Sequence, residues 1–112
     1  MSIEIEPSRQ AESRETIQRL GLADYVEFIL ADAALVLPSQ REPFDFALID
    51  CEKHDYIRFF DMIPAAPETV VVADNILSHG LTDYSAHVHS RGGLQSVTLP
   101  IGKGLEVSVY AG

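Results

Sequence analysis

Hydrophobic residues recur along the chain in short runs separated by polar connections that contain proline or glycine, a pattern typical of strands alternating with helices. Residues 2–6 (SIEIE) alternate apolar and polar side chains, which predicts a strand. Further strands are predicted at 26–31, 44–50 and 68–74. In residues 44–50 (FDFALID) the apolar side chains fall on both faces, as expected of a strand covered by helices on both sides of a parallel sheet.

Helices are predicted in the connections between these strands. The first covers residues 8–20 and ends at Gly21, which suits a left-handed C-cap. Ser8 is the predicted N-cap of this helix. A helical turn is expected after Asp32, and longer helices are expected at 54–63 and 81–91.

The carboxyl-terminal part has a different pattern, with two β-prone segments close together in the sequence. Residues 94–100 (LQSVTLP) and 104–110 (GLEVSVY) predict two strands that pair antiparallel. Together with the earlier alternation of strands and helices, this hairpin predicts an α/β fold with a mostly parallel sheet. The chain has no internal repeat or flexible linker, so residues 1–112 are expected to form a single domain.

Composition and charge narrow the classes of function. The chain has 112 residues, of which 46% are hydrophobic and 22% charged, which suits one small globular domain. Eight Lys and Arg against seventeen Asp and Glu give a net charge of -9, which disfavours nucleic acid and anionic lipid as partners. The apolar runs are far shorter than the roughly 20 residues that a membrane-spanning helix needs, so no membrane association is expected.

Two further features bear on localisation. Glu4 and Glu6 stand where a signal peptide would need a basic start and an apolar stretch. Cys51 is the single cysteine and cannot form an internal disulfide, which favours a reducing compartment. A cytoplasmic protein is therefore expected.

Acidic residues follow each of the four early strands. They are Glu4 or Glu6, Asp32, Asp50 and Asp74. Ligands of open parallel sheets bind beyond the carboxyl ends of the strands, so these side chains are expected to converge on one edge of the sheet. The alternative for each residue alone is structural, because Asp is favoured at strand ends and helix caps whatever the function.

Asp50, Asp74 and Asn75 form the sharper group of candidates. Adjacent strands would bring two carboxylates and one amide oxygen within reach of one ion, and three hard oxygen ligands suit Mg²⁺ better than zinc. Lys53 begins the next helix and is a candidate general base. Its alternative is an ordinary solvated lysine.

The remaining chemistry-bearing side chains are assigned no role. The four histidines, His54, His79, His87 and His89, have no metal-ligand spacing to Cys51. Cys51 itself is expected to be a small packing residue, because no paired base that would make it a nucleophile can be identified.

Five segments in this order resemble a known family: IEIEP, RLGLADYVEFILADA, FDFALIDCEKHDY, VVVADNILSHG and LPIGKGLEVSVY. The specific parts are the acidic tip IDCEK followed by HDY, and the pair ADN followed by the loop glycine Gly80. The chain resembles the class I S-adenosylmethionine-dependent O-methyltransferases of the catechol and caffeoyl-CoA type. The resemblance covers nearly all of its residues.

The resemblance implies a cofactor site. Glu4 would hydrogen-bond the ribose hydroxyls of S-adenosylmethionine, and Asp32 with Ala33 would border the adenine. Asp50 would lie close to the methionine part of the cofactor. The resemblance therefore assigns cofactor binding to these four residues.

The resemblance also implies a metal and a base. Asp50, Asp74 and Asn75 would ligate Mg²⁺, and Lys53 would take the proton from the acceptor hydroxyl. The implied reaction is direct in-line transfer of the methyl group to a hydroxyl of a small acceptor, for example a phenolic one.

The chain also departs from the family pattern. In the family a central strand and a glycine-rich cofactor loop precede the segment equivalent to IEIEP, and here no glycine precedes Gly21. The expected fold is therefore a partial Rossmann-like sheet that lacks the strand between those of Glu4 and Asp50. Such a sheet would close the gap, leave edges exposed or take a strand from another chain, for example in a homodimer.

Two functions of different classes follow. The first is a metal-assisted O-methyltransferase, or the carboxyl half of one. The second is a non-catalytic methyltransferase-like remnant or interaction module that has lost cofactor binding. A third interpretation is a truncated product of a longer reading frame.

Overall fold

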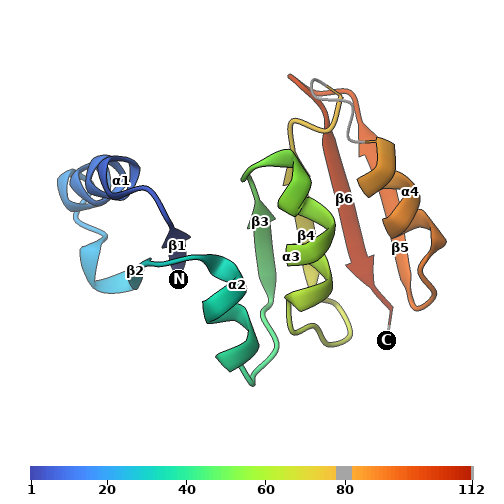
Figure 1. The fold of residues 1–112 in the computed structure, drawn as a ribbon, viewed down its shortest axis with the longest axis horizontal. Coiled ribbons are helices and arrows are strands. Elements are labelled where there is room, and N and C mark those ends of the chain that lie inside the picture. The colour runs from blue at the N-terminus through green and yellow to red at the C-terminus, as the bar shows by residue number, and fades with distance from the viewer. Residues whose placement is uncertain (78–81, 112) are drawn as a thin grey trace. The chain divides into compact units, whose positions relative to one another are not determined.

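The computed structural model of the chain describes residues 1–77 and 82–111. The chain divides into two compact units, Met1–Ser39 and Gln40–Gly112. Figure 1 shows the helices and strands of both units. No helix in the described part of the chain is long and apolar enough to cross a membrane.

The first unit is a small parallel β-α-β arrangement. Strand β1 (Ser2–Glu4) pairs in parallel with strand β2 (Phe28–Leu30), with Glu4 opposite Leu30. Helix α1 (Pro7–Arg19) and the 3-10 helix η1 (Ala23–Tyr25) connect them. Helix α2 (Ala33–Val36) and the 3-10 helix η2 (Leu37–Ser39) follow β2. The predicted strands and helices of this part are confirmed.

The two ends of α1 differ in how well they were predicted. The N-cap is Glu6, not Ser8: the Glu6 carboxylate accepts hydrogen bonds from the Ser8 backbone at 3.5 Å and from its hydroxyl at 3.0 Å. The reason is Pro7, which is pre-set for the first helical position, so the cap falls on Glu6, two residues before Ser8. At the other end Gly21 has φ 73°, which confirms the predicted left-handed cap.

The second unit contains a four-stranded sheet with the order β3-β4-β6-β5. Its strands are β3 (Phe46–Ile49), β4 (Val70–Asp74), β5 (Leu94–Leu99) and β6 (Leu105–Tyr110). Strands β3 and β4 are parallel, whereas β6 pairs antiparallel with both β4 and β5. The mostly parallel α/β architecture with an antiparallel carboxyl-terminal hairpin is thus confirmed.

Two helices cover one face of this sheet. They are α3 (Tyr56–Met62), which follows the 3-10 helix η3 (Lys53–Asp55), and α4 (Thr82–Ser90). Both lie in front of the sheet in Figure 1. Buried aromatic rings join them: Tyr84 of α4 packs edge to face on Tyr56 and on Phe60 of α3, each at a centroid distance of 5.7 Å.

Within the second unit, helices cover only one of the two faces predicted to be covered in residues 44–50. Ile49 is buried beneath the helices, but Phe46 and Leu48 are 58% and 60% exposed. Successive side chains of a strand point to opposite faces, and α3 and α4 both lie on the Ile49 side. In addition, no described strand pairs with the outer edge of β3.

Strand β6 has an unusual distribution of polar residues. Glu106 and Ser108 point toward the helices and are fully buried, whereas Val107 and Val109 lie on the opposite face. The Glu106 carboxylate accepts hydrogen bonds from the hydroxyls of three residues: Ser85, Ser96 and Thr98. His89 Nε2 lies 3.0 Å from Glu106 Oε2. The carboxylate therefore connects α4 to the β5–β6 hairpin.

These partners decide the protonation state of Glu106. Burial alone would raise its pKa, because it disfavours the charged form. The hydrogen bonds from Ser96, Thr98 and Ser85 and the nearby His89 outweigh burial, so the pKa of Glu106 lies below its ordinary value of 4.5. The ionised carboxylate therefore stabilises the fold above that ordinary value, and this stabilisation is lost as the pH falls through the lower pKa of the folded state.

Replacing Glu106 by Gln tests this interpretation. The amide keeps the size of the side chain but adds two donors among hydroxyl partners, so Glu106→Gln should lower the free energy of unfolding at pH 7 by about 2–4 kcal/mol. The wild-type advantage should shrink as the pH falls below 4.5, because Glu106 takes up a proton in the unfolded chain before it does so in the folded one. Urea unfolding between pH 3 and 7 measures both effects. The exposed Glu42→Gln is the control, and an equal effect of the two variants would contradict the role of Glu106.

Candidate functional site

Asp50, Asp74 and Asn75 lie together at the carboxyl ends of β3 and β4. The parallel register pairs Ile49 with Ala73, so the next residue of each strand is an aspartate at the same end of the sheet. The Asn75 side-chain amide donates a hydrogen bond to Asp50 Oδ1 at 3.2 Å. The Asn75 backbone amide donates to Asp74 Oδ1 at 2.7 Å. The structure therefore brings together the three residues that the sequence analysis grouped.

The backbone at Asn75 makes a left-handed turn, with φ 62°. Asn tolerates this conformation better than most non-glycine residues, because its short polar side chain can hydrogen-bond locally. The chain on either side is fixed: Asp74 pairs with Leu105 of β6, and the Ile76 backbone amide donates to the Gly104 carbonyl at 3.1 Å. The turn lets the Asn75 side chain reach Asp50 at the end of β3.

A buried phenol lies beneath this turn. The hydroxyl of Tyr56, the first residue of α3, donates a hydrogen bond to the backbone carbonyl of Asp74 at 2.8 Å. Burial, and then the nearby Cys51 and Asp50, raise the pKa of Tyr56 to about 12. The phenol is therefore a neutral donor at physiological pH. The sequence predicts Tyr56 within a helix at 54–63 but gives no indication of this hydrogen bond.

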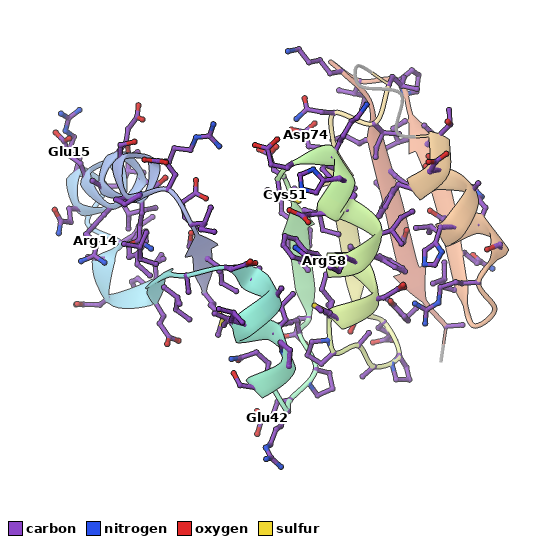
Figure 2. The ribbon with its side chains drawn as sticks, viewed as in Figure 1. Arg14, Glu15, Glu42, Cys51, Arg58 and Asp74 are labelled. Atoms are coloured by element: carbon purple, nitrogen blue, oxygen red, sulfur yellow. The ribbon has the colours of Figure 1, made fainter. Side chains whose placement is uncertain are left out.

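Cys51 lies next to the site without being a nucleophile. Its side chain is half-buried and packs against the core, which confirms the expected packing role. Burial raises the pKa of the Cys51 thiol to about 12, and the carboxylates of Asp55, Asp50 and Glu52 add to the shift. Figure 2 shows Cys51 and Asp74 near the same end of the sheet.

Lys53, the candidate base, is the first residue of η3 and is exposed. It lies three residues beyond Asp50, in the segment that leads from β3 to the buried Tyr56. The structure thus places Lys53 just after the Asp50 end of the site. Its role as a base stays a prediction.

The described histidines contact carboxylates. His54 lies 3.6 Å from Asp55, and His87 lies 2.8 Å from Asp61, measured from ring nitrogen to carboxylate oxygen. His89 contacts Glu106, as described above. His79 and the loop glycine Gly80 lie outside the described residues. Among residues 1–77 and 82–111, no group of three or more His, Cys, Asp or Glu side chains could hold a metal ion.

The first unit gathers the other predicted residues at one edge of its sheet. Glu4 ends β1, and the residue after β2, Ala31, donates its backbone amide to the Glu4 carbonyl at 2.9 Å. Asp32 is the N-cap of α2, and its carboxylate accepts from the Ala34 backbone amide at 2.9 Å. Asp32 therefore caps α2, and its predicted role at the adenine stays a prediction. Ala33 is the first residue of the same helix.

Proteins with an open parallel α/β sheet bind their ligands beyond the carboxyl ends of the strands, and the polar residues described above lie at such ends. A family model of O-methyltransferases matches residues 1–92, and the chain belongs to this family. It is 30% identical over 83 residues to the catechol O-methyltransferase of Mycobacterium tuberculosis, a match that covers 71% of this chain and 38% of that protein. The predicted resemblance is thus confirmed.

Solved structures agree in fold. The S-adenosylhomocysteine-bound methyltransferase PaMTH1 of Podospora anserina has a TM-score of 0.87 at 19% identity; the match covers 98% of this chain and 59% of PaMTH1. The S-adenosylmethionine complex of TomG, an O-methyltransferase of Streptomyces achromogenes, has a TM-score of 0.85 at 22% identity, with coverage of 98% and 60%. The chain therefore spans about three fifths of the length of these structures.

The thiol of Cys51 offers a direct check of the site's electrostatics. Because the pKa of Cys51 is about 12, its alkylation rate should keep rising with pH beyond pH 10. An ordinary thiol reaches its maximum rate above its pKa of about 8.5. Cys51 is the only cysteine in the sequence, so iodoacetamide labelling followed by mass spectrometry reads this residue alone. A rate that levels off below pH 9 would contradict the assigned burial and negative surroundings.

Proposed function

We propose that the chain is a metal-assisted, S-adenosylmethionine-dependent O-methyltransferase, or the carboxyl half of one, that transfers a methyl group to a hydroxyl of a small, for example phenolic, acceptor. The observation that carries this proposal is the convergence of Asp50, Asp74 and Asn75 at the carboxyl ends of β3 and β4. Membership of the O-methyltransferase family supports methyl transfer as the reaction.

The proposed cofactor residues are Glu4, Asp32, Ala33 and Asp50. Glu4 and Asp32 stand at the ends of two adjacent parallel strands, as a nucleoside-binding edge requires. Each uses one carboxylate oxygen within its own loop: Glu4 Oε2 accepts from the Ile5 backbone amide and Asp32 Oδ1 from Ala34. The other oxygen of each can accept from a ribose hydroxyl or an adenine amine. S-adenosylmethionine supplies the methyl group.

The donor set at Asp50, Asp74 and Asn75 fits a hard divalent cation such as Mg²⁺. Two carboxylates and an amide supply oxygen ligands, which Mg²⁺ prefers, and they leave positions for water and substrate oxygens. The Asn75 amide directs its nitrogen at Asp50, and a half-turn about the last side-chain bond would direct its oxygen there instead. When bound, the cation would hold the acceptor hydroxyl and lower its pKa.

Lys53 is the proposed general base. In the transfer, the acceptor oxygen forms a bond to the methyl carbon as the carbon–sulfur bond breaks, and the sulfur keeps the bonding electron pair. The proton of the acceptor hydroxyl goes to Lys53 Nζ, which accepts it as the neutral amine and becomes the ammonium. The position of Lys53, just after Asp50 and exposed, supports this role.

The alternative is an interaction module that does not bind the cofactor. The open outer edge of β3 and the exposed Phe46 and Leu48 favour it, since an unpaired strand edge can accept a strand from another chain. A second copy of the chain is one such partner, and sedimentation analysis reports whether it dimerises.

Calorimetric titration with S-adenosylhomocysteine separates the two proposals. The O-methyltransferase proposal predicts binding in the micromolar range, and Glu4→Gln should weaken it about tenfold by exchanging a carboxylate acceptor for an amide. Glu12→Gln, which alters an exposed residue of α1, is the matched control and should bind like the wild type. A folded chain that binds no S-adenosylhomocysteine would favour the interaction module.

Measurements of kcat test the proposed role of Lys53 as the general base. With S-adenosylmethionine, Mg²⁺ and a panel of phenolic acceptors, Lys53→Ala should lower kcat about a hundredfold or more, because proton transfer in the transition state is lost. Its affinity for S-adenosylhomocysteine should not change. Lys103→Ala removes the only other lysine of the sequence and should keep wild-type activity. Equal kcat values for the two variants would exclude Lys53 as the base.

A further inference from the structure

We propose that Tyr56 is the positioning residue of this site, because its buried hydroxyl holds the Asp74 carbonyl and thereby the left-handed turn from which the Asn75 side chain reaches Asp50. The proposal rests on the proposed function where it concerns cation binding. The part that concerns the turn depends only on the fold. Neither part places Tyr56 in contact with the substrate or the cofactor.

The first argument is that the turn at Asn75 is held at both ends. On one side the Tyr56 hydroxyl donates to the Asp74 carbonyl at 2.8 Å. On the other side the Ile76 backbone amide donates to Gly104 at 3.1 Å, and the Leu77 amide donates to Lys103 at 2.9 Å. A left-handed residue other than glycine persists only where its surroundings impose that conformation. Of these bonds, only the one from Tyr56 uses a side chain.

The second argument is that the Tyr56 side chain is itself fixed. It is 2% exposed, and its ring meets Tyr84 edge to face at an interplanar angle of 84°. The ring therefore has little freedom, and the hydroxyl stays aimed at the end of β4.

The third argument comes from the neighbouring Tyr84, which supplies an internal comparison. It is as deeply buried as Tyr56, but its hydroxyl has no hydrogen-bond partner within the described part of the chain. Both tyrosines belong to one aromatic cluster, and each loses a single oxygen on replacement by Phe. Only the Tyr56 replacement removes a hydrogen bond to the site.

The consequence is a specific loss of cation affinity. Tyr56→Phe keeps the ring in the core but releases the Asp74 carbonyl, so the turn relaxes and the Asn75 side chain moves away from Asp50. Affinity for Mn²⁺, a spectroscopic substitute for Mg²⁺, should fall about tenfold, the equivalent of one hydrogen bond. Tyr84→Phe should leave that affinity unchanged.

Two measurements on the full chain test the proposal. Electron paramagnetic resonance titration gives the Mn²⁺ affinity of the wild type, Tyr56→Phe and Tyr84→Phe. Nuclear magnetic resonance without metal gives the Asn75 amide and Cα chemical shifts, which report its backbone conformation. We expect both readouts to change in Tyr56→Phe and neither in Tyr84→Phe. Unchanged Asn75 shifts would overturn the proposal, and so would equal Mn²⁺ affinity of Tyr56→Phe and a wild type that binds Mn²⁺.

The two readouts also separate this proposal from the proposed function. If the wild type binds no Mn²⁺ but the Asn75 shifts change in Tyr56→Phe, the positioning role stands and the metal assignment fails. If Tyr56→Phe does not fold, the wild type still gives an answer through the hydroxyl protons of labelled tyrosines. The Tyr56 hydroxyl proton should exchange slowly with solvent and show a cross-peak to Asp74, and its absence would overturn the proposal.

Discussion

The parallel register between β3 and β4 is the constraint on which the candidate site depends. It pairs Ile49 with Ala73, so the chain leaves both strands at the same end of the sheet and places Asp50 beside Asp74 and Asn75. Burial holds this register, because Ile49, Val71 and Ala73 all face the helices and a slip of one residue would turn these side chains to the opposite face. Core packing therefore brings the residues of the site together, and no long loop is needed to do so.

Two buried polar groups stabilise the same sheet, one of them neutral and the other ionised. Tyr56 has one acceptor in the Asp74 carbonyl, and burial keeps its phenol neutral. Glu106 is surrounded by hydroxyl donors and His89, and these overcome burial so that its carboxylate stays ionised. A buried acid is charged only where enough donors surround it. The first group orders the turn at the site, and the second fixes α4, whose Tyr84 packs against Tyr56.

Much of the fold could be predicted from the sequence, since the alternation of apolar runs with breakers such as Gly21 marks the strands and helices directly. The predictions of the helix start and of the covered strand faces differ from the structure, because each depends on residues outside the pattern that was read. Pro7 moves the start of α1 to Glu6, and the apolar residues of β3 do not reveal that both helices lie on one side. Glu106 and Tyr56 could not be found, because their partners lie at distant positions in the chain. The group of Asp50, Asp74 and Asn75 could be predicted, because strand ends follow from the apolar pattern.

The most direct test of the central claim is a titration of the ¹⁵N-labelled chain with Mg²⁺, followed residue by residue with nuclear magnetic resonance. The account predicts saturable shifts centred on the amides of Asp50, Cys51, Asp74 and Asn75, with Asp74→Ala abolishing them. Shifts centred instead on the surface carboxylates, such as Asp55 or Asp61 with their Arg and His neighbours, would contradict it. Shifts that rise linearly without saturation at every acidic residue would contradict it as well.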